Sequence, residues 1–303
     1  MRHATTALVF VLAASLAGAP IAAAQQTERR MIVSVVDDDG APATGLMAVD
    51  FEIREDDAAR EVLRVGPAGA DRQIAILVDT SQAASRVTTD LRRGLEAFVD
   101  GMREGNRIAL ITFGGPPRIL VESTSSLERL RDGIGRVFPQ ASQAAYMLDA
   151  MGEVAEGFTR RGAARPIMVV LTMEALDYSN RWGEQVLDRI RESGAAVYMI
   201  SVEARRNRGG FGFGGLDDQQ RQVERDIVLA RGPEESGGFH RDVLASSALE
   251  EALADIATEL RNQYLVVYSS PDSLIPPEEV EVGVTRNGLT ARGTLLRGED
   301  ARP

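Results

Sequence analysis

The feature that most constrains this chain is the segment IAILVDTSQAAS at residues 74–85, where an apolar run leads into acidic and hydroxyl side chains. Such a run is typical of a strand that is covered on both faces of a parallel sheet. Asp79, Thr80 and Ser81 follow at its carboxyl end, where ligands collect in a doubly wound sheet. Asp79 and Ser81 could offer hard oxygen ligands to a divalent cation, but the next alternate position is Ala83. The segment therefore predicts only part of a cation site.

The composition excludes several classes of function. The 303 residues include no cysteine and only two histidines, His3 and His240, so zinc sites built on sulfur or on several imidazoles are excluded. The sequence has no lysine, which rules out a lysine nucleophile. Its formal net charge of -11 argues against nucleic acid and anionic lipid as partners.

The amino-terminal residues have the pattern of a secretory signal peptide at residues 1–24. Arg2 and His3 precede an apolar run, and three alanines at 22–24 are the small residues that a signal peptidase requires. We therefore expect cleavage near Ala24 and a periplasmic or secreted mature chain of about 280 residues, without a membrane span. An uncleaved anchor is the alternative, but the apolar run is short for a span of about 20 residues.

The mature chain divides into three zones. Residues 25–72 alternate apolar and polar positions, which predicts an amino-terminal β segment. Residues 73–268 alternate strands and amphipathic helices at the spacing of parallel crossovers. Residues 269–303 return to short strands, which predicts a carboxyl-terminal β-hairpin tail. We therefore expect a doubly wound, mostly parallel α/β sheet flanked by helices, with small antiparallel β elements formed by the two terminal segments.

Individual elements follow from apolar runs, amphipathic periods and turn residues. The expected strands of the middle zone cover residues 74–78, 107–113, 118–122, 167–172, 196–202 and 264–268. The expected helices cover residues 87–102, 126–137, 145–158, 182–193, 217–230 and 247–261. Turns are expected at 37–40, at 55–58 and at the Asn287-Gly288 pair of the hairpin.

One stretch rich in arginine, glycine and phenylalanine interrupts the last crossover. It reads RRNRGGFGFGG, from Arg205 to Gly215. It is either a mobile surface loop or a contact loop near the ligand edge of the sheet, in which Phe211 and Phe213 would touch a partner.

Several collinear segments resemble the von Willebrand factor A-type domain, specifically the bacterial VWFA-related lineage that is common in acidobacteria. VSVVDDDGAPATGLMAVDFEIREDD resembles the leading strand segment of that lineage, and IAILVDTSQA resembles its first core strand and metal loop. Three further segments resemble parts of the same lineage. AAYMLDAM is similar to the start of one of its helices, PIMVVLTMEALDYSN to the end of one of its strands, and LRNQYLVVYSSP to its closing segment. The resemblance covers nearly the whole mature chain and implies the doubly wound fold.

The resemblance also implies a metal-ion-dependent adhesion site, where three loops hold Mg²⁺ or Mn²⁺ with one position open for a partner's carboxylate. Asp79 and Ser81 match two of the usual ligand positions. The other three positions fall on Ala83, Ala145 and Met173, whose side chains carry no oxygen. Mg²⁺ that is held mostly by its own water gains little over solution. We therefore expect a degenerate site with weak or no divalent metal binding and no required cofactor.

Two alternatives remain open for this edge of the sheet. Ser85, Glu174 and Asp177 lie close in sequence to the lost positions and could act as substitute ligands in a metal-dependent adhesin. Without metal, Asp79 and Ser81 would instead cap the free amide groups of the following helix, and Met173 would make the floor of the cleft apolar. An apolar floor would suit a hydrophobic or arginine-bearing partner.

Catalysis has little support in the sequence. Ser236 and His240 could be read as a nucleophile and a base, but they are too close along the chain for a typical triad. The sequence has no G-x-S-x-G elbow, phosphate loop or dinucleotide fingerprint. We therefore expect a non-enzymatic, adhesion-type module with an unidentified protein partner.

Overall fold

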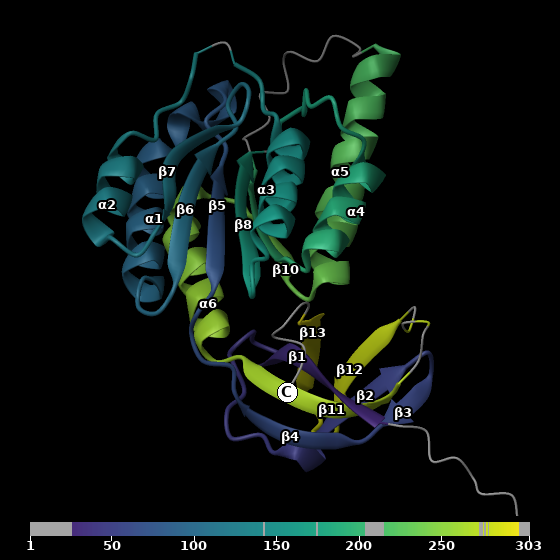
Figure 1. Ribbon diagram of the computed structural model, residues 1–303. Coiled ribbons are helices and arrows are strands. Elements are labelled where there is room, and N and C mark those ends of the chain that lie inside the picture. The colour runs from purple at the N-terminus through teal and green to yellow at the C-terminus, as the bar shows by residue number, and fades with distance from the viewer. Residues whose placement is uncertain are drawn as a thin grey trace, which may run out of the picture.

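The computed structural model describes residues 26–296, apart from 142, 174, 204–214, 273, 274, 276 and 278. These residues form an α/β domain that stands on a smaller β lobe (Figure 1). The expected signal peptide, the substitute ligand Glu174, and Phe211 and Phe213 lie outside the described residues. No helix in the described part of the chain is both long and apolar enough to cross a membrane.

The α/β domain is built on a six-stranded sheet with the order β10-β9-β8-β5-β6-β7. Its strands are parallel except for β7, which pairs antiparallel with β6 at one edge. Every residue of β8 and β9 is buried, which explains why both strands are unbroken apolar runs. The strands are β5 (Gln73–Val78), β6 (Arg107–Thr112), β7 (Arg118–Thr124), β8 (Pro166–Met173), β9 (Ala196–Val202) and β10 (Phe239–Val243).

Helices cover both faces of this sheet. Ile74, Ile76 and Val78 of β5 pack with α1, α2 and α6, whereas Ala75 and Leu77 pack with α3, α4 and α5. Alternate residues of one strand therefore serve two cores, as a doubly wound fold requires. One face carries α1 (Thr88–Met102), α2 (Leu127–Gly135) and α6 (Leu249–Arg261); the other carries α3 (Met147–Arg161), α4 (Gly183–Ser193) and α5 (Leu216–Ser236). Short 3₁₀ turns occur at η1 (Ala48–Asp50), η2 (Gln82–Arg86) and η3 (Ser246–Ala248). The predicted fold class is confirmed.

The β lobe consists of a four-stranded sheet, β13-β1-β11-β4, and a three-stranded sheet, β12-β2-β3, around one apolar core. Strands from both terminal zones therefore build a single unit. The larger sheet contains β1 (Gln26–Asp37), β4 (Val62–Pro67), β11 (Tyr264–Pro271) and β13 (Leu289–Leu295). The smaller sheet contains β2 (Phe51–Glu55), β3 (Ala58–Arg60) and β12 (Val280–Val284).

Two expectations about the carboxyl-terminal strands are wrong. The strand expected at 264–268 exists as β11, but it pairs with β1 and β4 in the β lobe and not in the α/β sheet. The sixth strand of the α/β sheet is instead β10. A chain reversal does occur at Asn287 and Gly288, where Gly288 has a φ of 72°. However, β12 and β13 pair with different strands in different sheets, so they do not form a hairpin.

The two predicted amino-terminal turns are confirmed. Asp37 Oδ1 accepts backbone hydrogen bonds from Asp39 and Ala41, and Gly40 supplies a φ of 81°. Asp56 and Asp57 have φ values of 46° and 66°, which matches the tight turn that joins β2 to β3. The acidic residues in both places therefore shape turns.

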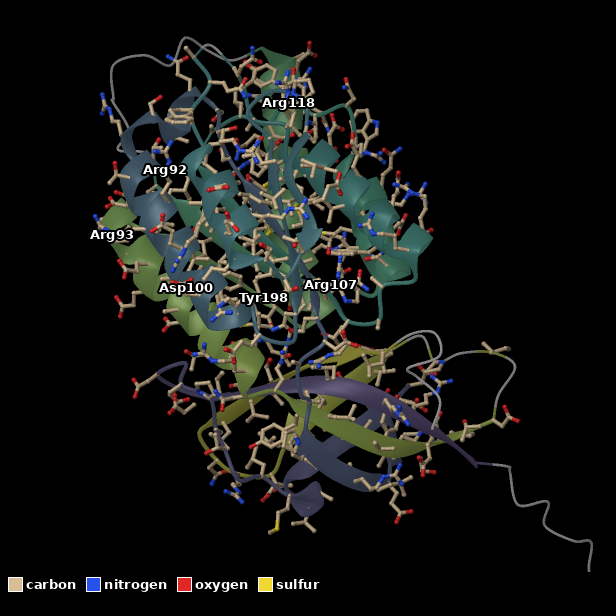
Figure 2. All side chains as sticks on the ribbon, turned by 60° about the vertical axis from the view of Figure 1, so that its left-hand side comes forward. Arg92, Arg93, Asp100, Arg107, Arg118 and Tyr198 are labelled. Atoms are coloured by element: carbon tan, nitrogen blue, oxygen red, sulfur yellow. The ribbon has the colours of Figure 1, made fainter. Side chains whose placement is uncertain are left out.

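A buried polar network joins the two lobes. Arg292 of β13 donates to Glu259 of α6 over 2.6 Å, and the Tyr198 hydroxyl donates to the same carboxylate over 3.2 Å. Gln263 Nε2 donates to Ser34 Oγ at 3.1 Å and to the Tyr198 hydroxyl at 3.3 Å. Figure 2 shows Tyr198 at the end of the α/β domain that faces the β lobe. This network fixes the end of α6 to the lobe, far from the carboxyl edge of the sheet.

Candidate functional site

The candidate site lies where β5 and β8 end side by side. Asp79 follows β5 and is 0% exposed. Its Oδ1 atom accepts a hydrogen bond from the backbone of Ser81 at 2.7 Å, and its Oδ2 atom accepts one from the backbone of Met173 at 3.1 Å. Both carboxylate oxygens of Asp79 therefore already hold two connections of the sheet together.

The buried side chain of Ser81 lies close enough to Asp79 to help lower the pKa of that carboxyl. Its Oγ atom makes no hydrogen bond of standard geometry within the described chain. A buried hydroxyl without a partner costs free energy, so this atom marks a place where a bound group could add an interaction. Asp79 and Ser81 are thus brought together as the sequence predicted.

The second connection places Ala145 between two neighbouring segments. Ala145 forms isolated bridges with Gly114 on one side and Asp177 on the other, and its carbonyl accepts from Tyr178 at 2.8 Å. Gly114 lies so close to the first connection that an added Cβ would sit 2.1 Å from the carbonyl carbon of Thr80. The three connections are therefore tightly packed around a position that offers no side-chain oxygen.

Asp177 and Ser85, the two proposed substitute ligands that the structure describes, both have other partners. Asp177 is buried; its Oδ2 atom accepts from the backbone of Met147 at 2.6 Å and its Oδ1 atom from the backbone of Ser179 at 3.0 Å. Met147 is the first residue of α3, so Asp177 caps that helix from a distant loop. Ser85 is exposed, and its Oγ atom donates to the Gln82 carbonyl at 2.6 Å.

Arg225 is a site residue that sequence reasoning missed. It comes from α5 and is 5% exposed, and its Nη2 atom donates to the carbonyl of Met173 at 3.0 Å. A sequence signal existed: Arg225 shares a helical face with the buried residues Val228, Leu229 and Gly232. A charged residue at a core-facing position needs a buried partner, and Met173 provides one.

The electrostatics of the site reflect burial opposed by Arg225. Burial raises the pKa of the Asp79 carboxyl above its usual range, while hydrogen bonds from Ser81 and Met173 and the charge of Arg225 act to lower it. Burial likewise raises the pKa of Asp177, and Arg225 again opposes the change. A permanent cation therefore lies close enough to influence both buried carboxyls.

These donors do not match the site that Mg²⁺ requires. Octahedral Mg²⁺ needs several oxygens, and of the five ligand positions that the resemblance implies, only Asp79 and Ser81 carry a side-chain oxygen. Within the described ranges, no group of three or more histidine, aspartate or glutamate side chains could hold a metal ion. Arg225 also lies close enough to lower the pKa of both Asp79 and Asp177, and a positive charge near these carboxyls opposes the binding of a cation.

An apolar cavity of about 670 Å³ opens beside these loops. We call it the Met173 pocket. Its apolar lining comes from the last residues of β8 and β9 and from the connections after β5 and β10: Met173, Val202, Ala83, Val87, Leu244 and Ala245. Two of the positions that would otherwise carry metal ligands, Ala83 and Met173, thus form part of an apolar wall.

The residues considered for catalysis do not form a triad. Ser236 Oγ donates to the Pro233 carbonyl and accepts from the backbone of Val197, so it joins α5 to β9. His240 Nε2 lies 2.7 Å from Ser201 Oγ and 3.4 Å from Asp242 Oδ1. The same ring nitrogen faces both groups, whereas a triad uses the two nitrogens for different partners.

The fold is a doubly wound α/β domain in which three connections meet at the carboxyl edge of the sheet. Residues 74–174 match the family model described as von Willebrand factor type A domain. The chain therefore carries a von Willebrand factor type A domain, as the sequence segments predicted. The narrower bacterial lineage remains a prediction.

Several solved structures are similar to this chain. The von Willebrand factor type A protein from Catenulispora acidiphila has 10% identity and a TM-score of 0.47, over 91% of this chain and 73% of its own. The vWF domain of the type V pili tip protein Mfa5 from Porphyromonas gingivalis has 10% identity and a TM-score of 0.44, over 62% and 94%. Conserved hypothetical protein BatB from Bacteroides thetaiotaomicron has 18% identity and a TM-score of 0.43, over 63% and 98%. No curated protein sequence matches the chain.

Proposed function

We propose that this protein is an exported, non-enzymatic interaction module whose type A domain binds a protein partner without a divalent metal. The observation that carries this proposal is the hydrogen-bonded link from Asp79 through Met173 to Arg225. In this link, hydrogen bonds within the chain occupy the groups that would otherwise surround a metal ion at the carboxyl edge of the sheet. The face that would be completed by an ion is thus already stabilised by the chain itself.

The alternative is a metal-dependent adhesin that recruits substitute oxygens. Ser85 and Asp177 give it little support, because Ser85 Oγ is bonded to Gln82 and both Asp177 oxygens accept backbone hydrogen bonds. To bind a metal ion, Asp177 would have to release the first turn of α3. Releasing a helix cap costs about 1 kcal/mol, which the ion would have to offset.

Export rests on the amino-terminal pattern of residues 1–24. We propose that the mature chain begins near Gln25 in the periplasm or outside the cell. Fractionation of cells that produce the tagged full-length chain, with amino-terminal sequencing of the product, tests this step. Recovery of the uncleaved chain from the cytoplasm would overturn it.

The interaction itself is tested by chemical cross-linking of the tagged mature chain in its own compartment, with and without EDTA. The partner captured in buffer should be captured equally well in EDTA. Asp79→Ala removes the hydrogen bonds to the backbone of Ser81 and Met173, and it should weaken capture only through that loss. Its effect should therefore also be independent of EDTA. A partner that is lost in EDTA would favour the metal-dependent alternative.

A further inference from the structure

The Met173 pocket carries information about what the partner presents. It lies on the side of the sheet edge where η2 and η3 approach, and β8 lies between β5 and β9 in the sheet. Met173, at the end of β8, therefore forms a floor between a wall that follows β5 and a wall that follows β9. A volume of about 670 Å³ is within the range of ligand sites and exceeds what a packing defect leaves.

The mouth of the pocket carries exposed apolar side chains beside its polar ones. Leu244, on the connection from β10 to α6, is 77% exposed although it lines the cavity. Val87 on the opposite wall is half-buried. An exposed leucine over an open apolar cavity is a feature of binding surfaces, because it gains burial only when a partner covers it.

The hydroxyl groups on the rim already donate to protein acceptors. Ser85 Oγ donates to the Gln82 carbonyl, and Ser246 Oγ donates to Asp90 at 2.6 Å. Neither hydroxyl proton is therefore free to bind a carboxylate or phosphate. This arrangement favours an apolar occupant over a polar one.

Two exposed charges of opposite sign flank the pocket. Arg86 lies on the wall that follows β5, and Glu203 on the wall that follows β9. Neither side chain makes an ion pair within the described chain. Unpaired charges at the rim of an interface steer and orient a partner of complementary charge.

We propose that the Met173 pocket receives an apolar side chain of the partner protein, on a segment with an acidic residue toward Arg86 and a basic residue toward Glu203. This inference rests on the proposed function and specifies the chemistry of its partner. An apolar anchor would take the place that a carboxylate occupies at a metal-dependent face. The losses at Ala83 and Met173 would then create a different binding chemistry on the same edge.

Short synthetic peptides provide the probe. Each has neutral spacers around a central leucine, with glutamate on one side and arginine on the other, in both chain orders. A matched set has alanine at the centre. The full mature chain is labelled with carbon-13 at methionine methyl groups, and Met173→Leu assigns the Met173 signal. The leucine peptides should shift that signal saturably, and the alanine peptides should bind at least about tenfold more weakly.

Leu244→Glu tests the pocket against a control of equal exposure. It should weaken the leucine peptide at least about tenfold, whereas Val49→Glu, also 77% exposed but in the β lobe, should leave binding unchanged. Equal binding of the leucine and alanine peptides, no shift of the Met173 signal, or equal behaviour of the two variants would overturn the inference.

Charge reversal tests the assigned orientation. The wild-type chain should prefer one peptide order, and Arg86→Glu combined with Glu203→Arg should prefer the other. An unchanged preference would overturn the assignment of the flanking charges. Cross-linking then separates the two proposals: if Leu244→Glu captures the cellular partner as well as wild type in EDTA, the pocket inference fails while the proposed function stands.

Discussion

Arg225 Nη2 donates to the Met173 carbonyl at 3.0 Å, and the backbone N–H of the same methionine donates to Asp79 at 3.1 Å. One residue thus links a buried arginine to a buried aspartate across the end of the central strand. The charge of Arg225 also acts to lower the pKa of two buried carboxyls, Asp79 and Asp177.

Removing Arg225 should therefore destabilise the fold. We expect Arg225→Met to lower the free energy of unfolding by about 2 kcal/mol, because it removes the charge-assisted hydrogen bond to the buried Met173 carbonyl. Urea unfolding of the mature chain measures the change. Arg231→Met on the same helix, which loses only exposed ion pairs, should leave stability nearly unchanged. Equal effects of the two variants would show that Arg225 has no special role.

His240 should make stability depend on pH. Burial lowers its pKa below the usual 6.5, and the charge of Arg225 adds to this while Asp242 opposes it. The unfolded chain then takes up a proton that the folded chain resists, so stability falls as the pH drops through about 6.5. Wild type should lose stability between about pH 7 and pH 5 relative to His240→Gln. Parallel curves for the two proteins would contradict the expected shift.

The strands and helices of the α/β domain could be predicted because their burial pattern is local. The run at residues 167–172 became a fully buried strand, and the loop after Val78 brought Asp79 and Ser81 together as expected. The partners of a strand are not local, however. Nothing in the periodicity of β11 indicates that it pairs with β1, whose paired residues lie about 240 positions earlier, or that β12 and β13 enter different sheets.

For the candidate site, the sequence indicated only which ligand positions lack a side-chain oxygen. Ala83, Ala145 and Met173 were matched to ligand positions only through the resemblance to the von Willebrand factor A-type domain, and their role stays a prediction. The role of Arg225 could not be assigned, because its bond to Met173 depends on how α5 packs against the end of β8. The capping role of Asp177 at Met147 depends likewise on two loops that meet only in the folded chain.

The junction of the two lobes provides a second test of buried charge. Glu259 is 5% exposed and is bonded to Arg292 and Tyr198. Arg292→Met should lower the free energy of unfolding by about 3 kcal/mol, because it leaves this carboxylate buried without its cation. Arg241→Met, which breaks an exposed pair with Asp255, is the matched control and should cost less than about 1 kcal/mol. A small effect at Arg292 would mean that the network does not hold the lobes together.

Restoring the missing oxygens should create metal affinity. We expect the triple variant Ala83→Ser, Ala145→Thr and Met173→Asp to bind Mn²⁺ at least about tenfold more tightly than wild type, because three loops would again supply hard ligands. Adding Arg225→Met should increase the affinity further by removing a competing positive charge. Calorimetry in matched buffers measures both steps. No gain in either variant would show that the loop geometry, and not the side chains, prevents binding.

The most direct test of the metal-free edge is a calorimetric titration of the wild-type mature chain with Mg²⁺, Mn²⁺ and Ca²⁺. We predict no binding in the micromolar range, because both Asp79 oxygens accept backbone hydrogen bonds and Met173 is bonded to Arg225. Micromolar binding of any of these ions that disappears in Asp79→Ala would contradict the account.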